Sequence, residues 1–221
     1  MNQAVTPPLP AWDLRLQKIV IFIGRIGLAY LFFTQLFWKL PPTFGCANDF
    51  AFPKPAEKGY WEANGSSGLC FWLGVESVFA SQPRQVLKIA DPPAGIPEFG
   101  VSITPLAQLN GAIVDNVIKP GIGLWGWLIW LAEFWVFASM LLGLFTRLGA
   151  LTSLAVSAQL YVALANVPRP VEWEWSYGLM VLLSILMLGL APGRVWGIDA
   201  WLRRRFLPGE GWVARAVAWL T

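Results

Sequence analysis

Histidine is absent from this chain of 221 residues, and cysteine occurs only twice. Without histidine the chain lacks the usual axial ligand of haem, the commonest zinc and copper ligand and the commonest general base. Two cysteines are too few to hold an iron–sulfur cluster. We therefore expect no haem or metal ligated by this chain. Redox chemistry here would need an organic carrier such as a quinone, or a partner subunit.

Charged residues are also scarce. They make up 13% of the chain, against the roughly 25% of a soluble domain, whereas apolar residues make up 56%. Crossing the hydrocarbon core of a bilayer takes about 20 apolar residues. The sequence offers four such runs, at about 19–40, 121–145, 148–167 and 175–191. These runs predict an integral membrane protein.

The predicted fold is all-α: one membrane domain over residues 1–221, built as a four-helix transmembrane bundle. Residues 41–119 form a loop too long for a bare connection, so we expect a small extracytoplasmic cap. Its best helical candidates are 69–80 and 104–118. After the fourth span, residues 195–221 carry three consecutive arginines between tryptophan-bearing apolar pieces, which predicts a basic interfacial helix on the cytoplasmic leaflet. A surface for docking a partner is the rival interpretation.

The distribution of basic residues predicts the orientation. No cleavable signal is visible at the start, so the first span should stay as an anchor. Most basic residues on one side of the predicted bundle lie in one long loop, and such loops count little. The other side carries Arg15, Lys18, Arg147, Arg194, Arg203, Arg204, Arg205 and Arg215. We therefore expect both termini on the cytoplasmic side of a bacterial or archaeal inner membrane. The net charge of +3 is then a cytoplasmic excess, not a sign of nucleic-acid binding.

The two cysteines, Cys46 and Cys70, both lie in the predicted outer loop. In an oxidising compartment a structural disulfide is the favoured state. Two free thiols and a redox-active pair remain alternatives, although the spacing is not the Cys-x-x-Cys of thiol exchange.

Two charges interrupt the predicted spans. Glu133 lies near the middle of its span, and Arg25 lies inside the first, where Phe32 and Lys39 follow at seven-residue intervals on nearly the same helical face. A charge at that depth costs about 3 kcal/mol or more, so it is normally paired or faces a polar cavity. The two opposite charges predict an Arg25–Glu133 pair. It is either a buried ion pair that fixes helix register, or part of a site that binds a quinone head group and carries its proton.

Other charged residues are weaker candidates. Lys39, Lys119 and Arg169 could attract an anionic substrate from the outer side, although a lysine like Lys39 is more often an end residue reaching for the interface. Arg147 and Asp199 are expected to cap or tie helix ends on the cytoplasmic side.

Three segments occur in a characteristic order. GRIGLAYLF at 24–32 leads to WKL at 38–40, Glu133 is followed by LLGLFTRLGA at 141–150, and GRVWGIDAWL stands at 193–202. This ordered set resembles the first span, the second-span signature and the closing segment of the DoxX superfamily. The extended first loop and the Gly-x-x-x-Asp close resemble its DoxD branch, the large membrane subunit of thiosulfate:quinone oxidoreductase.

The resemblance implies a four-helix membrane bundle and a connection to quinone, with no covalent cofactor. On this basis we expect a subunit of a quinone-linked redox complex, at most part of a quinone-dependent oxidoreductase. The alternative is a non-catalytic accessory or scaffold subunit of a larger respiratory or photosynthetic complex. A small transporter or channel is a third class, disfavoured because the spans show no internal repeat and no broken helix. In each case the expected partners are lipid and other membrane subunits.

Overall fold

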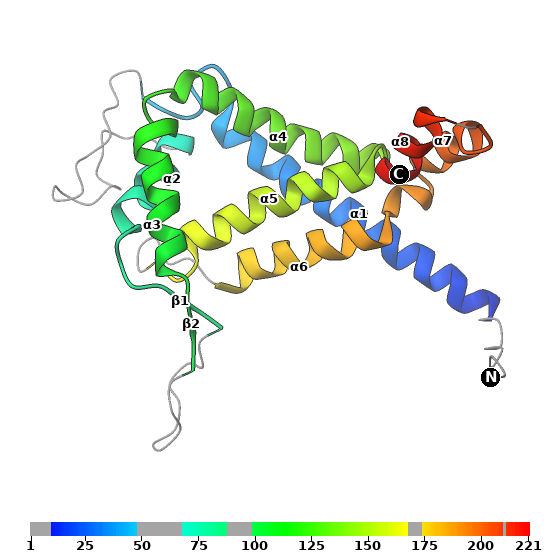
Figure 1. Cartoon of the computed structure of the whole chain (residues 1–221), viewed down its shortest axis with the longest axis horizontal. Coiled ribbons are helices and arrows are strands. Elements are labelled where there is room, and N and C mark those ends of the chain that lie inside the picture. Colours follow the sequence, from blue (N-terminus) through cyan, green and yellow to red (C-terminus); the bar gives the residue numbers. More distant parts are fainter. Residues whose placement is uncertain (1–9, 48–67, 88–98, 168–173, 210) are drawn as a thin grey trace.

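The computed structural model describes residues 10–47, 68–87, 99–167, 174–209 and 211–221 (Figure 1). Most of this part is helical. In chain order the elements are α1 (Ala11–Leu36), η1 (Phe37–Lys39), α2 (Gly68–Phe79), β1 (Gln85–Val86), β2 (Val101–Ser102), α3 (Thr104–Ile113), η3 (Val114–Ile118), α4 (Ile122–Leu142), α5 (Thr146–Leu164), α6 (Glu174–Leu190), η4 (Pro192–Arg194), α7 (Ile198–Phe206) and α8 (Trp212–Leu220).

Three helices of the described part are long and apolar enough to cross a membrane. They are α1 with η1, α4 and α5, whose lengths of 29, 21 and 19 residues correspond to about 43, 31 and 28 Å. These helices indicate an integral membrane protein. The fourth expected span, α6, is apolar but has only 17 residues, about 25 Å, so a fourth crossing stays a prediction.

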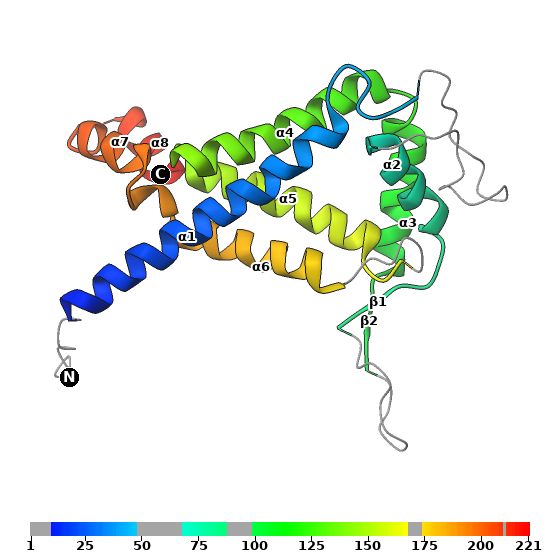
Figure 2. The same ribbon diagram turned by 180° about the vertical axis from the view of Figure 1, so that it is seen from behind.

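The four long helices pack in a ring. α1 packs against α4, α4 against α5, α5 against α6, and α6 against α1. Figures 1 and 2 show that α7 and α8 lie at one end of this bundle, and that the first turns of α1 project beyond it. At the opposite end, α2 and α3 stand across the bundle. We call this the disulfide end, because Cys46 and Cys70 lie there, and the other the α7 end.

The α4–α5 turn begins earlier in the chain than the sequence predicted. The predicted spans end at 145 and begin at 148, whereas α4 ends at Leu142 and α5 begins at Thr146. Gly143 ends α4 in the left-handed conformation, with a φ of +65°, and Phe145 is also left-handed, with a φ of +47°. Glycine occupies that region without strain, which explains the position of the break.

The described parts of residues 41–119 include two helical segments. Both helices predicted in this loop are present, as α2 and as α3 continued by the π-helix η3. β1 and β2 add a short antiparallel ladder that pairs Gln85 with Ser102 and Val86 with Val101. α2 packs against α3, α5 and η1, which anchors this segment to the bundle.

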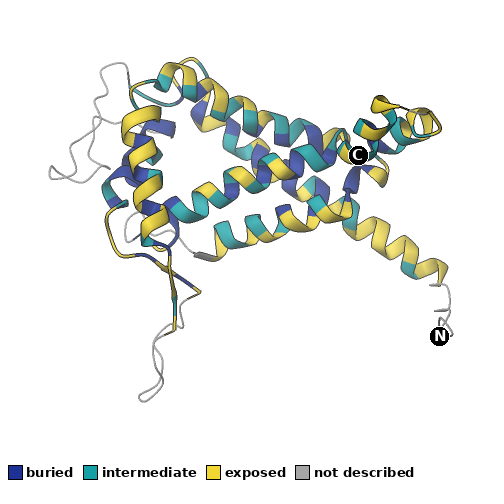
Figure 3. Cartoon of the chain, viewed as in Figure 1, coloured by how far each residue is buried: buried dark blue, intermediate teal, exposed yellow. Residues whose placement is uncertain are grey.

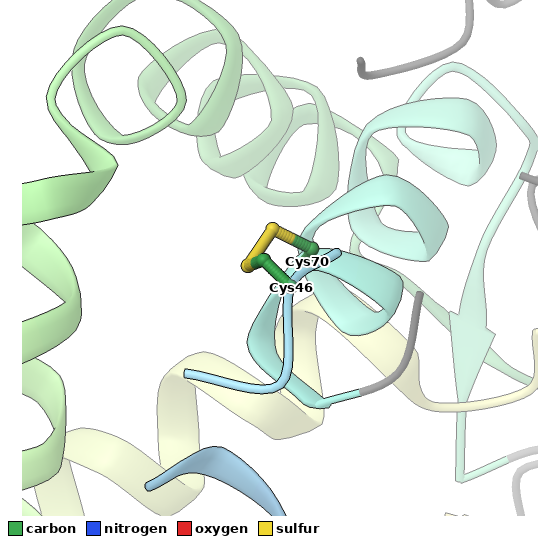
Figure 4. Close-up of a disulfide and its surroundings, with 2 residues drawn as sticks. All are labelled: Cys46 and Cys70. Carbon is green, nitrogen blue, oxygen red and sulfur yellow. A yellow bond between two sulfur atoms is a disulfide. The ribbon is translucent and has the colours of Figure 1, made fainter. Parts of the chain in front are cut away.

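The predicted disulfide between Cys46 and Cys70 is present. Figure 4 shows that it joins the segment after α1 to the first turn of α2. Because the cysteines are 24 residues apart, the bond restricts the unfolded chain and should contribute about 3 kcal/mol.

Reduction of this disulfide is expected to lower the unfolding midpoint in denaturant, because the α2 segment loses its covalent tie. The measurement is detergent-solubilised unfolding with and without a reductant. The double variant Cys46→Ser/Cys70→Ser serves as control and should match the reduced protein in both buffers. Equal midpoints for the oxidised and reduced wild type would contradict a stabilising role.

The buried residues lie mainly where the helices contact one another (Figure 3). One apolar cluster joins α1, α4, α5 and α6 around Leu28, Phe32, Val136 and Met140. A second joins α2 to the end of α5 around Val75 and Leu164. Several charged side chains are buried beside these clusters, and they define the candidate site.

Candidate functional site: buried charges along the bundle

Lys39 and Glu133 form an ion pair inside the bundle. The Lys39 Nζ donates a hydrogen bond to Glu133 Oε1, and the two residues are only 6% and 3% exposed. The ammonium also lies 4.5 Å from the ring centroid of Trp38, a cation–π contact. Within the described residues, Glu133 Oε2 is buried and has no hydrogen-bond partner. This carboxylate oxygen can therefore accept a further hydrogen bond, and it can donate one only when the acid is protonated.

The helical repeat of α1 positions Lys39. Arg25, Phe32 and Lys39, spaced by seven residues, are all buried, as the seven-residue interval suggested. The stripe faces α4, and η1 continues it by one turn to place Lys39 at its end. Lys39 is therefore a buried partner of Glu133 and not an end residue that reaches for the interface. Its predicted attraction for an anionic substrate stays a prediction.

The predicted Arg25–Glu133 pair is wrong. The guanidinium of Arg25 lies against Gly143, at the end of α4. It is so close that a Cβ atom at this position would collide with it. Glu133 precedes Gly143 by ten residues, which is about 15 Å along α4 toward the disulfide end. Arg25 cannot span that distance, whereas Lys39, fourteen residues further along the antiparallel α1, comes level with Glu133.

Arg25 instead binds main-chain carbonyls at the α7 end. Its Nη1 donates to Val195 O at 3.0 Å and to Pro192 O at 3.4 Å, and its Nη2 donates to Trp196 O at 3.4 Å. The ring of Phe22 lies 5.1 Å from the guanidinium carbon. Arg25 thus ties α1 to the turn that follows α6.

Asp199 caps α5 from a distant part of the chain. This residue is 0% exposed, and its carboxylate accepts hydrogen bonds from Phe145 N at 2.6 Å, Thr146 N at 2.9 Å and Thr146 Oγ1 at 2.7 Å. Thr146 Oγ1 in turn accepts from Gly193 N at 3.0 Å. A carboxylate at a helix N-terminus accepts hydrogen bonds from the free N–H groups, and its negative charge interacts favourably with the positive end of the helix dipole. Asp199 therefore joins α5, α7 and η4.

Arginines near α8 bind its last carbonyl groups. Arg194 Nη2 and Nε donate to the main-chain oxygen of Thr221 at 2.8 and 3.1 Å. Arg147 Nη1 lies 3.4 Å from Ala218 O and from Trp219 O. Burial lowers the pKa of the Arg194 guanidinium, and the neighbouring Arg203 and Arg147 lower it further. Arg147 thus lies at a helix end, in contact with α8.

A second buried carboxyl, Glu76 of α2, lies at the disulfide end. It is 4% exposed, and its Oε2 accepts hydrogen bonds from Asn110 Nδ2 at 2.9 Å and Gln159 Nε2 at 2.8 Å. Gln159 Nε2 also donates to Asn110 Oδ1 at 3.1 Å. The three side chains come from α2, α3 and α5, so the cluster connects the α2–α3 segment with the bundle. Burial raises the pKa of Glu76 to about 7, although both amides and the charges of Arg84 and Lys39 act against the rise.

Arg84 lies beside this cluster. It is 4% exposed, and its guanidinium donates hydrogen bonds to the carbonyls of Phe79, Val162 and Ala163. Arg84 thereby connects the C-terminal end of α2 with the C-terminal end of α5. Burial lowers its pKa, and the charge of Glu76 opposes that shift.

Of the two remaining anion-attracting candidates, the structure describes only Lys119. Lys119 pairs with Asp115 at 2.6 Å, one helical turn earlier, and Asp115 also accepts from Ser77 Oγ at 2.7 Å. Arg169 lies outside the described residues. Within the described ranges no cluster of three acidic or cysteine side chains that could hold a metal occurs.

A chain of aromatic rings follows the outer side of the α1–α4 contact, next to Lys39 and Glu133. We call it the aromatic seam. Its neighbouring ring centroids lie 4.9 to 6.4 Å apart, in the order Phe37, Phe33, Phe137, Phe134, Trp130 and Trp127. Phe33, Phe37, Trp127 and Phe134 are exposed, and Trp130 Nε1 donates to Leu36 O at 3.3 Å.

A small pocket lies beside the disulfide. Its volume is about 180 Å³, and its lining includes Phe44, Cys46, Cys70 and Ile122. Sites for organic ligands usually measure roughly 300–1,000 Å³, so this pocket suits only a smaller molecule.

Sequence reasoning missed Glu76, Arg84 and the Glu76 amides. Glu76 is the only charged residue in the apolar run of α2, so the argument that identified Glu133 could have identified it too.

The fold and the buried charges define a helical membrane protein with an internal Lys–Glu pair and a separate carboxyl cluster. No family model, curated protein or solved structure matches the chain.

Proposed function

We propose that this chain is a DoxX/DoxD-like integral membrane subunit of a quinone-linked redox complex, in which Lys39 and Glu133 form the quinone-facing site. The observation that carries the proposal is the buried Lys39–Glu133 pair, in which Glu133 Oε2 has no partner within the described residues. The ordered DoxX-like motifs support the same assignment. The relation to thiosulfate:quinone oxidoreductase belongs to this proposal as its particular form.

The pair has the chemistry that a quinone head group requires. When bound, a quinone would supply electron and proton transfer to the complex. Lys39 takes the role that the sequence suggested for Arg25, because its positive charge can stabilise negative charge that develops on a carbonyl oxygen. Glu133 Oε2 can hold or release a proton beside that oxygen. Arg25 is assigned a positioning role for the helices, not a role in this site.

The aromatic seam supports an approach from the lipid. Its exposed rings offer flat faces beside the α1–α4 contact, and aromatic rings stack favourably on one another in offset or edge-to-face arrangements. A planar, lipid-soluble ring could lie against this surface with its oxygen toward Lys39. The small pocket at the disulfide is not part of this proposal.

The membrane arrangement completes the proposal. α6 forms the fourth crossing, with its shortness offset by local thinning of the bilayer. Both termini are cytoplasmic, α2 and α3 form an extracytoplasmic cap, and α7 and α8 lie along the cytoplasmic leaflet, in a bacterial or archaeal inner membrane. The basic residues of α7 favour this side.

Photolabelling with an azido-quinone tests the site. We expect label on peptides of α1 and α4 in the protein extracted with mild detergent, and we expect unlabelled quinone to compete. The matched variant is Lys39→Met/Glu133→Leu, which removes both charges without leaving an unpaired one and should bind at least tenfold more weakly. Lys18→Met, at an exposed position of the same helix, should label like wild type.

Undiminished, competed labelling in Lys39→Met/Glu133→Leu would overturn the assignment of the site. Absence of quinone from the native protein, together with absence of labelling, would overturn the quinone proposal itself. Mass spectrometry of the same extract identifies cofactors and partner subunits.

The second candidate is a non-catalytic accessory or scaffold subunit of a larger respiratory or photosynthetic complex. The observation that favours it is the set of exposed tryptophans around α7 and α8, namely Trp196, Trp201, Trp212 and Trp219, which are 55–76% exposed. Tryptophan is enriched at protein interfaces. Recovery only within a complex whose other subunits hold all the redox centres would favour this role.

A further inference from the structure

We propose that Glu76 is a proton-binding site whose proton affinity is coupled through Lys39 to the charge of Glu133. The inference does not require quinone binding. It rests on the burial of both carboxyls, on their hydrogen bonds, and on the packing of η1, which carries Lys39, against α2, which carries Glu76.

The surroundings of Glu76 suit both of its protonation states. As a carboxylate, it accepts two amide hydrogen bonds at Oε2, from Asn110 and Gln159. As a neutral acid, it avoids the cost of keeping a charge in a buried site. These opposing effects bring the pKa to about 7, where small changes in nearby charge alter the proton occupancy.

Charged and polar groups reach Glu76 from several elements packed around it. Arg84, which follows α2, and Lys39, on η1, are the two charges that favour its carboxylate. From α3 and α5 it meets the uncharged Asn110 and Gln159. Asp115, on η3, bonds to Ser77 and Lys119.

Lys39 provides the coupling. Its ammonium is bonded to Glu133, and η1, which carries Lys39, packs against α2, which carries Glu76. The Lys39 charge therefore also favours the carboxylate of Glu76. Loss of the negative charge on Glu133 would leave the Lys39 charge unopposed, which favours ionised Glu76. Loss of the Lys39 charge would favour neutral Glu76. Opposite responses to these two changes are the signature of the coupled site.

Infrared difference spectroscopy of the purified full-length chain during a pH titration tests the inference. We expect a carbonyl stretching band of a protonated carboxylic acid that disappears with a midpoint near pH 7. The band should be lost in Glu76→Gln. It should be kept in Asp115→Asn, because Asp115 is an exposed residue. The midpoint should fall by up to about one pH unit in Glu133→Gln and rise by a similar amount in Lys39→Met.

Each outcome is decisive for the proton site. A band with this midpoint that persists in Glu76→Gln, or no such band in wild type, overturns the assignment of Glu76. A midpoint unchanged in Glu133→Gln overturns the coupling, and this variant suffices if Lys39→Met does not fold. Quinone is absent from the experiment, so failure of the quinone proposal would leave these results unaffected.

Discussion

Replacement of Lys39 by methionine is expected to destabilise the protein by about 3–5 kcal/mol, because Glu133 would remain buried without its partner. For a chain of this size, that loss corresponds to a fall of roughly 10 °C or more in the unfolding temperature. Thermal unfolding in detergent, followed by the fluorescence of the 14 tryptophans, measures it.

Two variants make this result specific. Lys18→Met removes an exposed lysine from the same helix and should shift the unfolding temperature by less than about 2 °C. Lys39→Met/Glu133→Leu removes the whole pair and should recover most of the loss, since apolar side chains can replace a buried ion pair. A Lys39→Met protein as stable as Lys18→Met would contradict the pairing.

Replacement of Asp199 by alanine is expected to cost about 3 kcal/mol or more. The change leaves Phe145 N, Thr146 N and Thr146 Oγ1 without their buried acceptor. It also removes the negative charge at the N-terminus of α5. The measurement is the free energy of unfolding in denaturant, and Asp199→Asn should show an intermediate loss because one oxygen acceptor remains.

Asp13→Ala is the matched control for Asp199. Asp13 lies in the first turn of α1, and its side chain bonds to no other helix within the described residues. Its free energy of unfolding should change by less than about 1 kcal/mol. Equal losses in Asp199→Ala and Asp13→Ala would show that the α4–α5 turn does not depend on this carboxylate.

The helices and the inward-facing stripe of α1 could be predicted from the sequence. The scarcity of charge identified the long apolar helices, and the seven-residue spacing identified Arg25, Phe32 and Lys39 as buried neighbours. The disulfide followed from the position of both cysteines in one loop. The apolar helices, the buried stripe of α1 and the disulfide can each be predicted from residues within one segment of the sequence. None of these predictions requires knowledge of how the helices pack together.

The pairing of charges could not be predicted in the same way. Sequence pattern shows that Arg25 and Glu133 each need a partner, but not how far each lies along its helix once α1 and α4 are packed. That register is set by contacts at the α7 end, where Gly143 leaves room for the Arg25 guanidinium. The Glu76 cluster was equally hidden, because Asn110 and Gln159 are distant from Glu76 in the sequence and meet it only after α2 packs across the bundle.

A pair of double-mutant cycles tests the central claim most directly. Free energies of unfolding are measured for Lys39→Met, Arg25→Met and Glu133→Leu, and for the two doubles that contain Glu133→Leu. The account predicts a coupling energy of about 2 kcal/mol or more between Lys39 and Glu133. Between Arg25 and Glu133 it predicts additivity within about 0.5 kcal/mol. Coupling of Glu133 to Arg25, with additivity toward Lys39, would contradict the account.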